Sequence, residues 1–253
     1  QSVAKVLGLE NVDDINSDFV INGNKKVNKI ALQIQKTVEL LSQAANDGNV
    51  ANEEVLDTVL ETFVDKIEEL KDESDDTKLN VANLVEQTVE TVSSADSKVR
   101  KLTGKVLTTN VTSQIKKVSK NIDIAFDNMK QNDGESFEDL VDKIIVLVED
   151  QVNTLEKAIE ENSVDSVEIE TFDKNNDKFT KTREELRVLG IQNELTFLNL
   201  SDPASIAQAL AQIKEPIIHP YNLYEVITKK FIEANPDFEE LKKKIDEYKS
   251  SIE

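Results

Sequence analysis

The chain of 253 residues contains no cysteine and no tryptophan, and it has only six glycines and four prolines. The lack of cysteine excludes disulfide bonds, thiolate nucleophiles and metal sites built on thiolates. The scattered glycines exclude a glycine-rich phosphate-binding loop. Nine phenylalanines and three tyrosines are the only aromatic residues, which leaves little material for base-stacking platforms or aromatic sugar-binding clefts.

Long apolar runs are also missing. No stretch approaches the ~20 apolar residues that cross a bilayer, and no signal peptide is visible, so we do not expect a membrane protein. The chain begins at Gln1 rather than at methionine, which suggests a processed product or a segment of a longer polypeptide.

The charge is strongly one-sided. Fifty acidic residues against 30 basic ones give a net charge of −20, which repels phosphate backbones and anionic lipids, so nucleic-acid binding is not expected. This charge suits an extracellular protein whose carboxylates meet divalent cations or basic partners. Adaptation to a salty cytosol is the alternative, but lysine, which such proteins shed, supplies nearly all of the positive charge.

What the chain does contain is helical periodicity. Aliphatic residues recur every three or four positions over about 25–46, 52–70, 79–94 and 97–132, and again from Ser136 to Ile159, and this spacing predicts long amphipathic helices. Gly104 and Asn110 predict a kink or break in the fourth segment, and Ser136 with Asp139 predicts a capping box. The residues expected on the buried side of the second helix are Leu56, Val59, Leu60, Phe63, Ile67 and Leu70.

These segments predict an all-α fold, an elongated bundle over residues 1–162 followed by a smaller, mostly helical C-terminal subdomain over 163–253. The alternation in 164–170 is compatible with a short strand. Helix starts in the C-terminal subdomain are predicted at three residue pairs, Asp202-Pro203, His219-Pro220 and Asn235-Pro236.

One loop resembles a calcium-binding pattern. Oxygen donors stand at its first, third, fifth and twelfth positions, with a backbone carbonyl at the seventh, as a calcium loop requires. The predicted ligands are Asp173, Asn175, Asp177, the carbonyl of Phe179, and Glu184. Lys178 stands where such loops carry glycine, so a solvated polar loop without calcium is the alternative.

No catalytic constellation stands out, and we expect no enzyme. His219 is the only histidine, and without a second histidine or a Gly-x-Ser-x-Gly elbow it is interpreted as structural. Chemistry that uses carboxylates alone stays open, since a pocket with two carboxylates in different environments would support it.

The first part of the chain carries one resemblance. Residues 3–15, followed by Gly23-Asn24 and the helix beginning near Val27, resemble helical modules of very large bacterial secreted and cell-surface adhesin-like proteins. Glu10 replaces a proline that is frequent there. The resemblance covers about the first 65 residues. It implies an extracellular, calcium-rich setting, a segment of a longer polypeptide, and no enzymatic activity.

Together these features predict a non-enzymatic structural or adhesive module of a bacterial cell-surface or extracellular-matrix protein. Such a module would associate with itself or with neighbouring domains of a larger surface protein. The alternative is a soluble lipid-binding or pore-forming protein whose amphipathic helices open onto a membrane. A pore former would be expected to carry a nearly uncharged hairpin, whereas the most apolar stretch, 144–148, is short.

Overall fold

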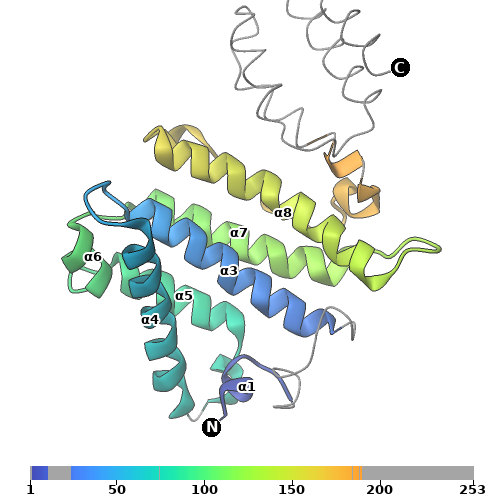
Figure 1. Cartoon of the computed structure of the whole chain (residues 1–253). Coiled ribbons are helices and arrows are strands. Elements are labelled where there is room, and N and C mark those ends of the chain that lie inside the picture. Colours follow the sequence, from blue (N-terminus) through green and yellow to red (C-terminus); the bar gives the residue numbers. More distant parts are fainter. Residues whose placement is uncertain (1, 11–23, 74, 184, 188, 190–253) are drawn as a thin grey trace, which may run out of the picture. The chain divides into compact units, whose positions relative to one another are not determined.

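The computed structural model describes residues 2–10, 24–73, 75–183, 185–187 and 189 (Figure 1). Residues 11–23, Glu184, His219 and the proline-started helices beyond residue 200 lie outside the described residues. The chain divides into two compact units, Gln1–Phe179 and Thr180–Glu253. The first unit holds nearly all of the described residues.

Helices account for almost all of the regular structure. The residues that the structure describes contain no strand, so the all-α prediction is confirmed for them. The α-helices are α1 (Val3–Val6), α3 (Lys25–Ala45), α4 (Asn52–Lys71), α5 (Val81–Ser93), α6 (Lys98–Thr103), α7 (Thr109–Asn128) and α8 (Phe137–Glu160). Short 3-10 turns occupy Asp76–Lys78, Val164–Ser166 and Asp177–Thr180.

Local sequence explains where the helices begin and end. Short polar side chains precede most of them and accept a backbone N–H of the first turn, which replaces a missing intrahelical bond. At α8 the predicted capping box is confirmed, because Asp139 N–H donates to Ser136 Oγ (3.1 Å) and Ser136 N–H donates to Asp139 Oδ2 (2.8 Å). The predicted break is also present, since Gly104 ends α6 with a left-handed φ of 72°. The other capping residues are Ser2, Asn24, Asn80, Ser97 and Thr108.

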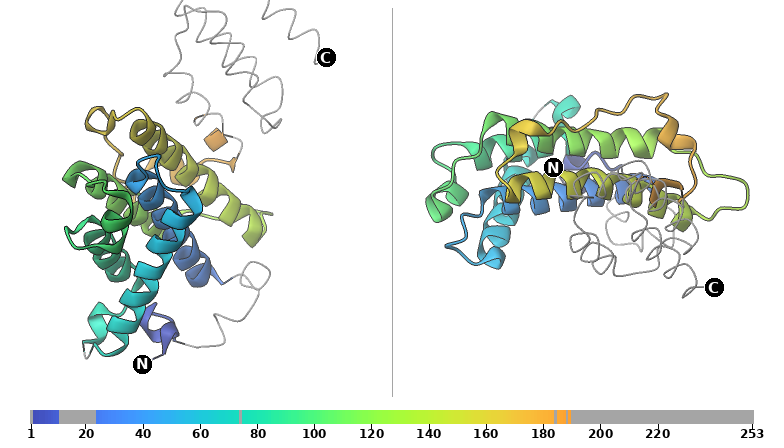
Figure 2. Two further views of the ribbon diagram at one scale, coloured as in Figure 1. Left: turned by 60° about the vertical axis from the view of Figure 1, so that its left-hand side comes forward. Right: turned by 90° about the horizontal axis from the view of Figure 1, so that it is seen from above.

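The central helix is α3, which packs against α4, α5, α7 and α8. Figures 1 and 2 show α3, α7 and α8 side by side. An ion pair of 2.7 Å between Lys29 at the start of α3 and Asp123 near the end of α7 reflects their antiparallel course. Gln43 Nε2 donates to Glu160 Oε1 at 3.1 Å. These residues lie near the C-terminal ends of α3 and α8, so the two helices run in parallel.

The core is aliphatic, as expected from the composition. The regular apolar stripe of the segment from Ser136 to Ile159 places Ile144, Leu147, Val148 and Val152 in the core, and all four are buried on α8, with at most 3% of their surface exposed. Two other positions in apolar stripes are not buried. Leu60 on α4, which was expected on the buried side, is 40% exposed, and Val106, in the connection from α6 to α7, is 55% exposed, because no described element covers these positions.

The segment after α8 does not form the short strand that its alternation allowed. Val164–Ser166 form a 3-10 turn, Val167 has extended dihedral angles, and residues 167–170 belong to no helix or strand. Ile169, Phe172 and Phe179 are buried. Residues 163–179 belong to the same compact unit as the helices before them. We call residues 164–172 the strap.

Candidate functional site

Two aromatic rings flank the first half of the loop predicted to bind calcium. Phe172 and Phe179 are buried and meet edge to face, with ring centres 5.7 Å apart. Between them, Asp173, Asn175 and Asp177 are exposed. Asp173 Oδ1 accepts the Asn175 N–H at 2.6 Å, a local bond of the kind that shapes aspartate turns. The packing of the two rings therefore anchors both ends of residues 173–178, whose polar side chains face solvent.

The sixth loop position carries a cation in place of glycine. Lys178 Nζ lies 3.2 Å from Glu170 Oε2 and 5.7 Å from the centre of the Phe172 ring. The backbone of Lys178 belongs to the 3-10 turn Asp177–Thr180, and its φ is not positive. Glu184 lies outside the described residues, and no group of three acidic or histidine side chains poised for a metal occurs among those that are described. Calcium binding by this loop stays a prediction.

A second polar site was not predicted. Three buried amide side chains, Gln114 and Asn121 on α7 and Gln151 on α8, bind the backbone of the strap. Gln114 Oε1 accepts the Ile169 N–H at 3.0 Å, and Gln114 Nε2 donates to the Val167 carbonyl at 3.2 Å. One amide thus satisfies a donor and an acceptor of the extended chain, much as a neighbouring strand would.

Asn121 continues this arrangement two turns further along α7. Its Oδ1 accepts the Phe172 N–H at 2.9 Å, and its Nδ2 donates to the Glu170 carbonyl at 2.6 Å and to Gln151 Oε1 at 2.9 Å. Gln151 Nε2 donates to the same Glu170 carbonyl at 3.1 Å. We call Gln114, Asn121 and Gln151 the amide clamp.

The clamp could have been suspected from the sequence. Asn110, Gln114 and Asn121 are separated by four and seven residues, so they share one face of α7. Asn110 also binds the strap, with Nδ2 donating to the Val164 carbonyl at 3.1 Å. Their spacing marks a polar line beside the apolar stripe, but it does not say which backbone the amides bind.

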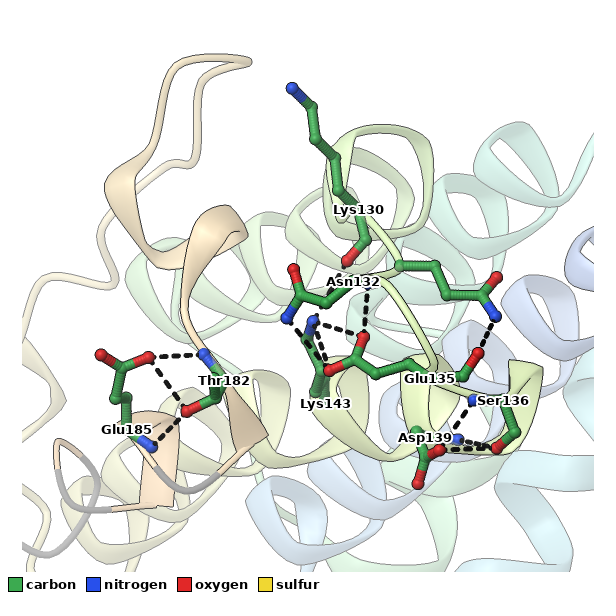
Figure 3. A network of polar contacts seen from close by, with 9 residues as sticks. Lys130, Asn132, Glu135, Ser136, Asp139, Lys143, Thr182 and Glu185 are labelled. Carbon is green, nitrogen blue, oxygen red and sulfur yellow. Dashed lines mark hydrogen bonds and ion pairs between the residues drawn. The ribbon is translucent and has the colours of Figure 1, made fainter.

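A buried ion pair holds the loop between α7 and α8. The Lys143 side chain is fully buried, and its Nζ donates to the Lys130 carbonyl at 3.1 Å and to the Glu135 carboxylate at 3.0 and 3.3 Å (Figure 3). The pKa of Glu135 is lowered, first because its carboxylate accepts the Asn132 N–H and further because of Lys143. These contacts occupy the ammonium group, so Lys143 ties the loop to α8.

The outer face of α4 carries the most exposed apolar surface on a described helix. Leu60 is 40% and Val64 56% exposed, and Leu56 and Ile67 are half-buried on the same face. We call these four residues the α4 stripe. Because they are four, four and three positions apart, they form a continuous line along the helix. The buried line of α4, through Val55, Val59 and Phe63, lies on a neighbouring arc.

Acidic residues run beside the α4 stripe. Glu53, Asp57 and Glu61 each precede a stripe residue by three positions, which makes them neighbours on the helix surface. Together with Glu54, Ala51 and Thr58 they line a shallow hollow of about 530 Å³. Glu61 pairs with Lys98 of α6 at 2.8 Å. Within the part of the chain that the structure describes, no lysine or arginine pairs with Glu53, Glu54 or Asp57.

Comparisons with known proteins give no relative: no protein family, no curated protein and no solved structure matches the chain.

Proposed function

We propose that the chain is a non-enzymatic structural or adhesive module of a bacterial cell-surface or extracellular-matrix protein. The observation that carries this proposal is the α4 stripe, in which Leu60 and Val64 expose 40% and 56% of their surface on a helix otherwise packed into the bundle. Contiguous apolar surface with a polar rim is typical of sites that bind another molecule. The module would therefore act by presenting this face to a neighbouring domain or protein.

Three further features support the setting, the shape and the calcium binding of the proposed module. The resemblance of the first residues to adhesin-like modules supports an extracellular or cell-surface setting. The length of α8, 24 residues or about 36 Å, supports an elongated bundle, to which a smaller helical C-terminal subdomain would be attached. The spacing of Asp173, Asn175 and Asp177 supports a calcium ion that stabilises the end of the bundle.

The alternative, a lipid-binding or pore-forming protein, makes a different use of amphipathic helices. It would have to open the bundle and turn buried stripes toward lipid. None of the helices in the described ranges is long and apolar enough to cross a membrane. The carboxylates beside the α4 stripe disfavour contact with anionic lipid, because like charges repel.

The two functions are separated by association and leakage measurements on the full chain. Sedimentation velocity and light scattering, across series of calcium and salt, should detect association that increases as the charge of −20 is screened. Dye-loaded liposomes should stay intact, and generic ester, phosphate and glycoside substrates should not be hydrolysed. A chain that stays monomeric in every condition and releases dye would reject the structural module in favour of the membrane-active protein.

A further inference from the structure

We propose that the outer face of α4 binds a cationic amphipathic helix of a partner protein. This inference rests on the proposed function and assigns a chemical class to the partner. The apolar side of the partner helix would cover the α4 stripe, and its lysine or arginine residues would meet Glu53 and Asp57 in the acidic hollow. Helices that dock on a helical protein in this way are anchored by residues spaced three and four apart, which is the spacing of the α4 stripe.

The position of the carboxylates supports this partner. Glu53 and Glu54 lie in the first turn of α4, where the helix dipole favours negative charge. Asp57 lies one turn further in, four residues from both Glu53 and Glu61, and like charges at this spacing destabilise a helix. Lys98 is shared by Glu61 and Asp65, and Asp57 pairs with no lysine or arginine among the described residues. A cation from outside would relieve this repulsion.

The same charges argue against other occupants. If a second copy met this face through a two-fold axis, the α4 acids would oppose their own equivalents. An anionic membrane would meet the same repulsion. A helix that is apolar on one side and bears lysine or arginine on the flank complements both features of the face, and complementary charge at an interface gives specificity and speeds association.

The experiment uses the full chain and three fluorescent synthetic peptides. The first is an amphipathic helix with a leucine stripe flanked by lysine and arginine, the second has the same composition in scrambled order, and the third has glutamate in place of the basic residues. Fluorescence anisotropy gives the dissociation constants. We expect the first peptide to bind at least about tenfold more tightly than the other two.

Variants of exposed residues test the two parts of the face separately. The double change Leu60→Ser and Val64→Ser removes the apolar line, and Glu53→Lys with Asp57→Lys reverses the acidic flank. Each should weaken binding of the first peptide at least about tenfold, and the charge reversal should also flatten its salt dependence. Glu138→Lys with Glu149→Lys, at two exposed positions on α8, is the matched control, because it changes the charge by the same amount, and it should leave binding unaltered. Circular dichroism of each variant verifies that it is folded.

Three results would overturn the inference. Equal binding of the scrambled peptide would show diffuse attraction to a chain of charge −20. Undiminished binding by either double variant would place the peptide elsewhere. Dimerisation of the wild type that Leu60→Ser and Val64→Ser abolishes would assign the face to a second copy. In that last case, and whenever the chain associates through another surface, the proposed structural function survives while this inference fails.

Discussion

Replacing Asn121 by alanine tests whether the amide clamp holds the strap. The Asn121 side chain is fully buried and makes three hydrogen bonds, to the Glu170 carbonyl, the Phe172 N–H and Gln151 Oε1. In the variant, Gln151 still donates to the Glu170 carbonyl. The Phe172 N–H and Gln151 Oε1, however, lose their partner in the interior.

The magnitude follows from these two orphaned groups. A buried donor or acceptor left without a partner costs about 1–3 kcal/mol, so Asn121→Ala should lower the free energy of unfolding by about 2–6 kcal/mol. Urea denaturation followed by circular dichroism measures this loss. Hydrogen exchange of the Phe172 amide reports on the strap itself, and it should accelerate more than exchange in the middle of α3, because local opening needs less free energy than global unfolding.

Asn128→Ala is the matched control for Asn121→Ala. Asn128 belongs to the same helix and is half-buried, and its Nδ2 donates only locally, to the Ile124 carbonyl at 2.8 Å. Its loss should cost below about 1 kcal/mol. If Asn121→Ala cost no more than Asn128→Ala and left exchange at Phe172 unchanged, the clamp would not be what holds the strap.

Three further predictions concern the core, a half-buried carboxylate and calcium. Ile144→Ala should cost about 2–5 kcal/mol in urea denaturation, since Ile144 is fully buried; a loss below about 0.5 kcal/mol would contradict its place in the core. Burial, and then the charge of Glu39, raises the pKa of Glu156, so its ionised form opposes folding. Glu156→Gln should therefore raise the free energy of unfolding at neutral pH. This gain should disappear as the pH falls through the raised pKa, because the wild-type carboxyl group is then neutral. A gain that does not depend on pH would show that ionised Glu156 does not oppose folding. Millimolar calcium should raise the melting temperature of the wild type by binding only the folded state, and Asp173→Ala with Asp177→Ala should remove that increment. An equal rise in the variant would instead indicate screening of the overall charge.

The strap shows how much of the backbone conformation and its hydrogen bonding a local sequence pattern can predict. The alternation in 164–170 was compatible with a short strand, but Val164–Ser166 form a 3-10 turn, Val167 has extended dihedral angles, and residues 167–172 belong to no helix or strand. In a strand, the backbone N–H and C=O groups would bind another strand. Here Gln114, Asn121 and Gln151 satisfy them. Those amides lie about 20 to 55 residues away along the chain, so no local pattern could assign them to the strap.

The candidate sites divide in a similar way. Spacing alone singled out the Asp173 to Glu184 loop, but it carried no sign that Lys178 would pair with Glu170 and lie near the Phe172 ring. The clamp shows the opposite case, because Gln114 and Asn121 were visible only as polar positions on one face of α7, and Gln151 lies on another helix. Side chains that meet across large sequence separations become a site only when the helices pack.

The sequence by itself determined the helices of this protein and most of their ends. Periodicity follows from the geometry of one helix, and caps such as Ser136 with Asp139 depend on residues three apart, so both can be read locally. Only the tertiary structure decided which apolar residues were covered. On α4 the apolar arc runs from Val55 and Val59 round to Leu60 and Val64, and it is wider than the neighbouring helices can bury. Val59 is buried and Leu60 is exposed because the position of α3, α5 and α6 against α4 is set by packing over the whole bundle.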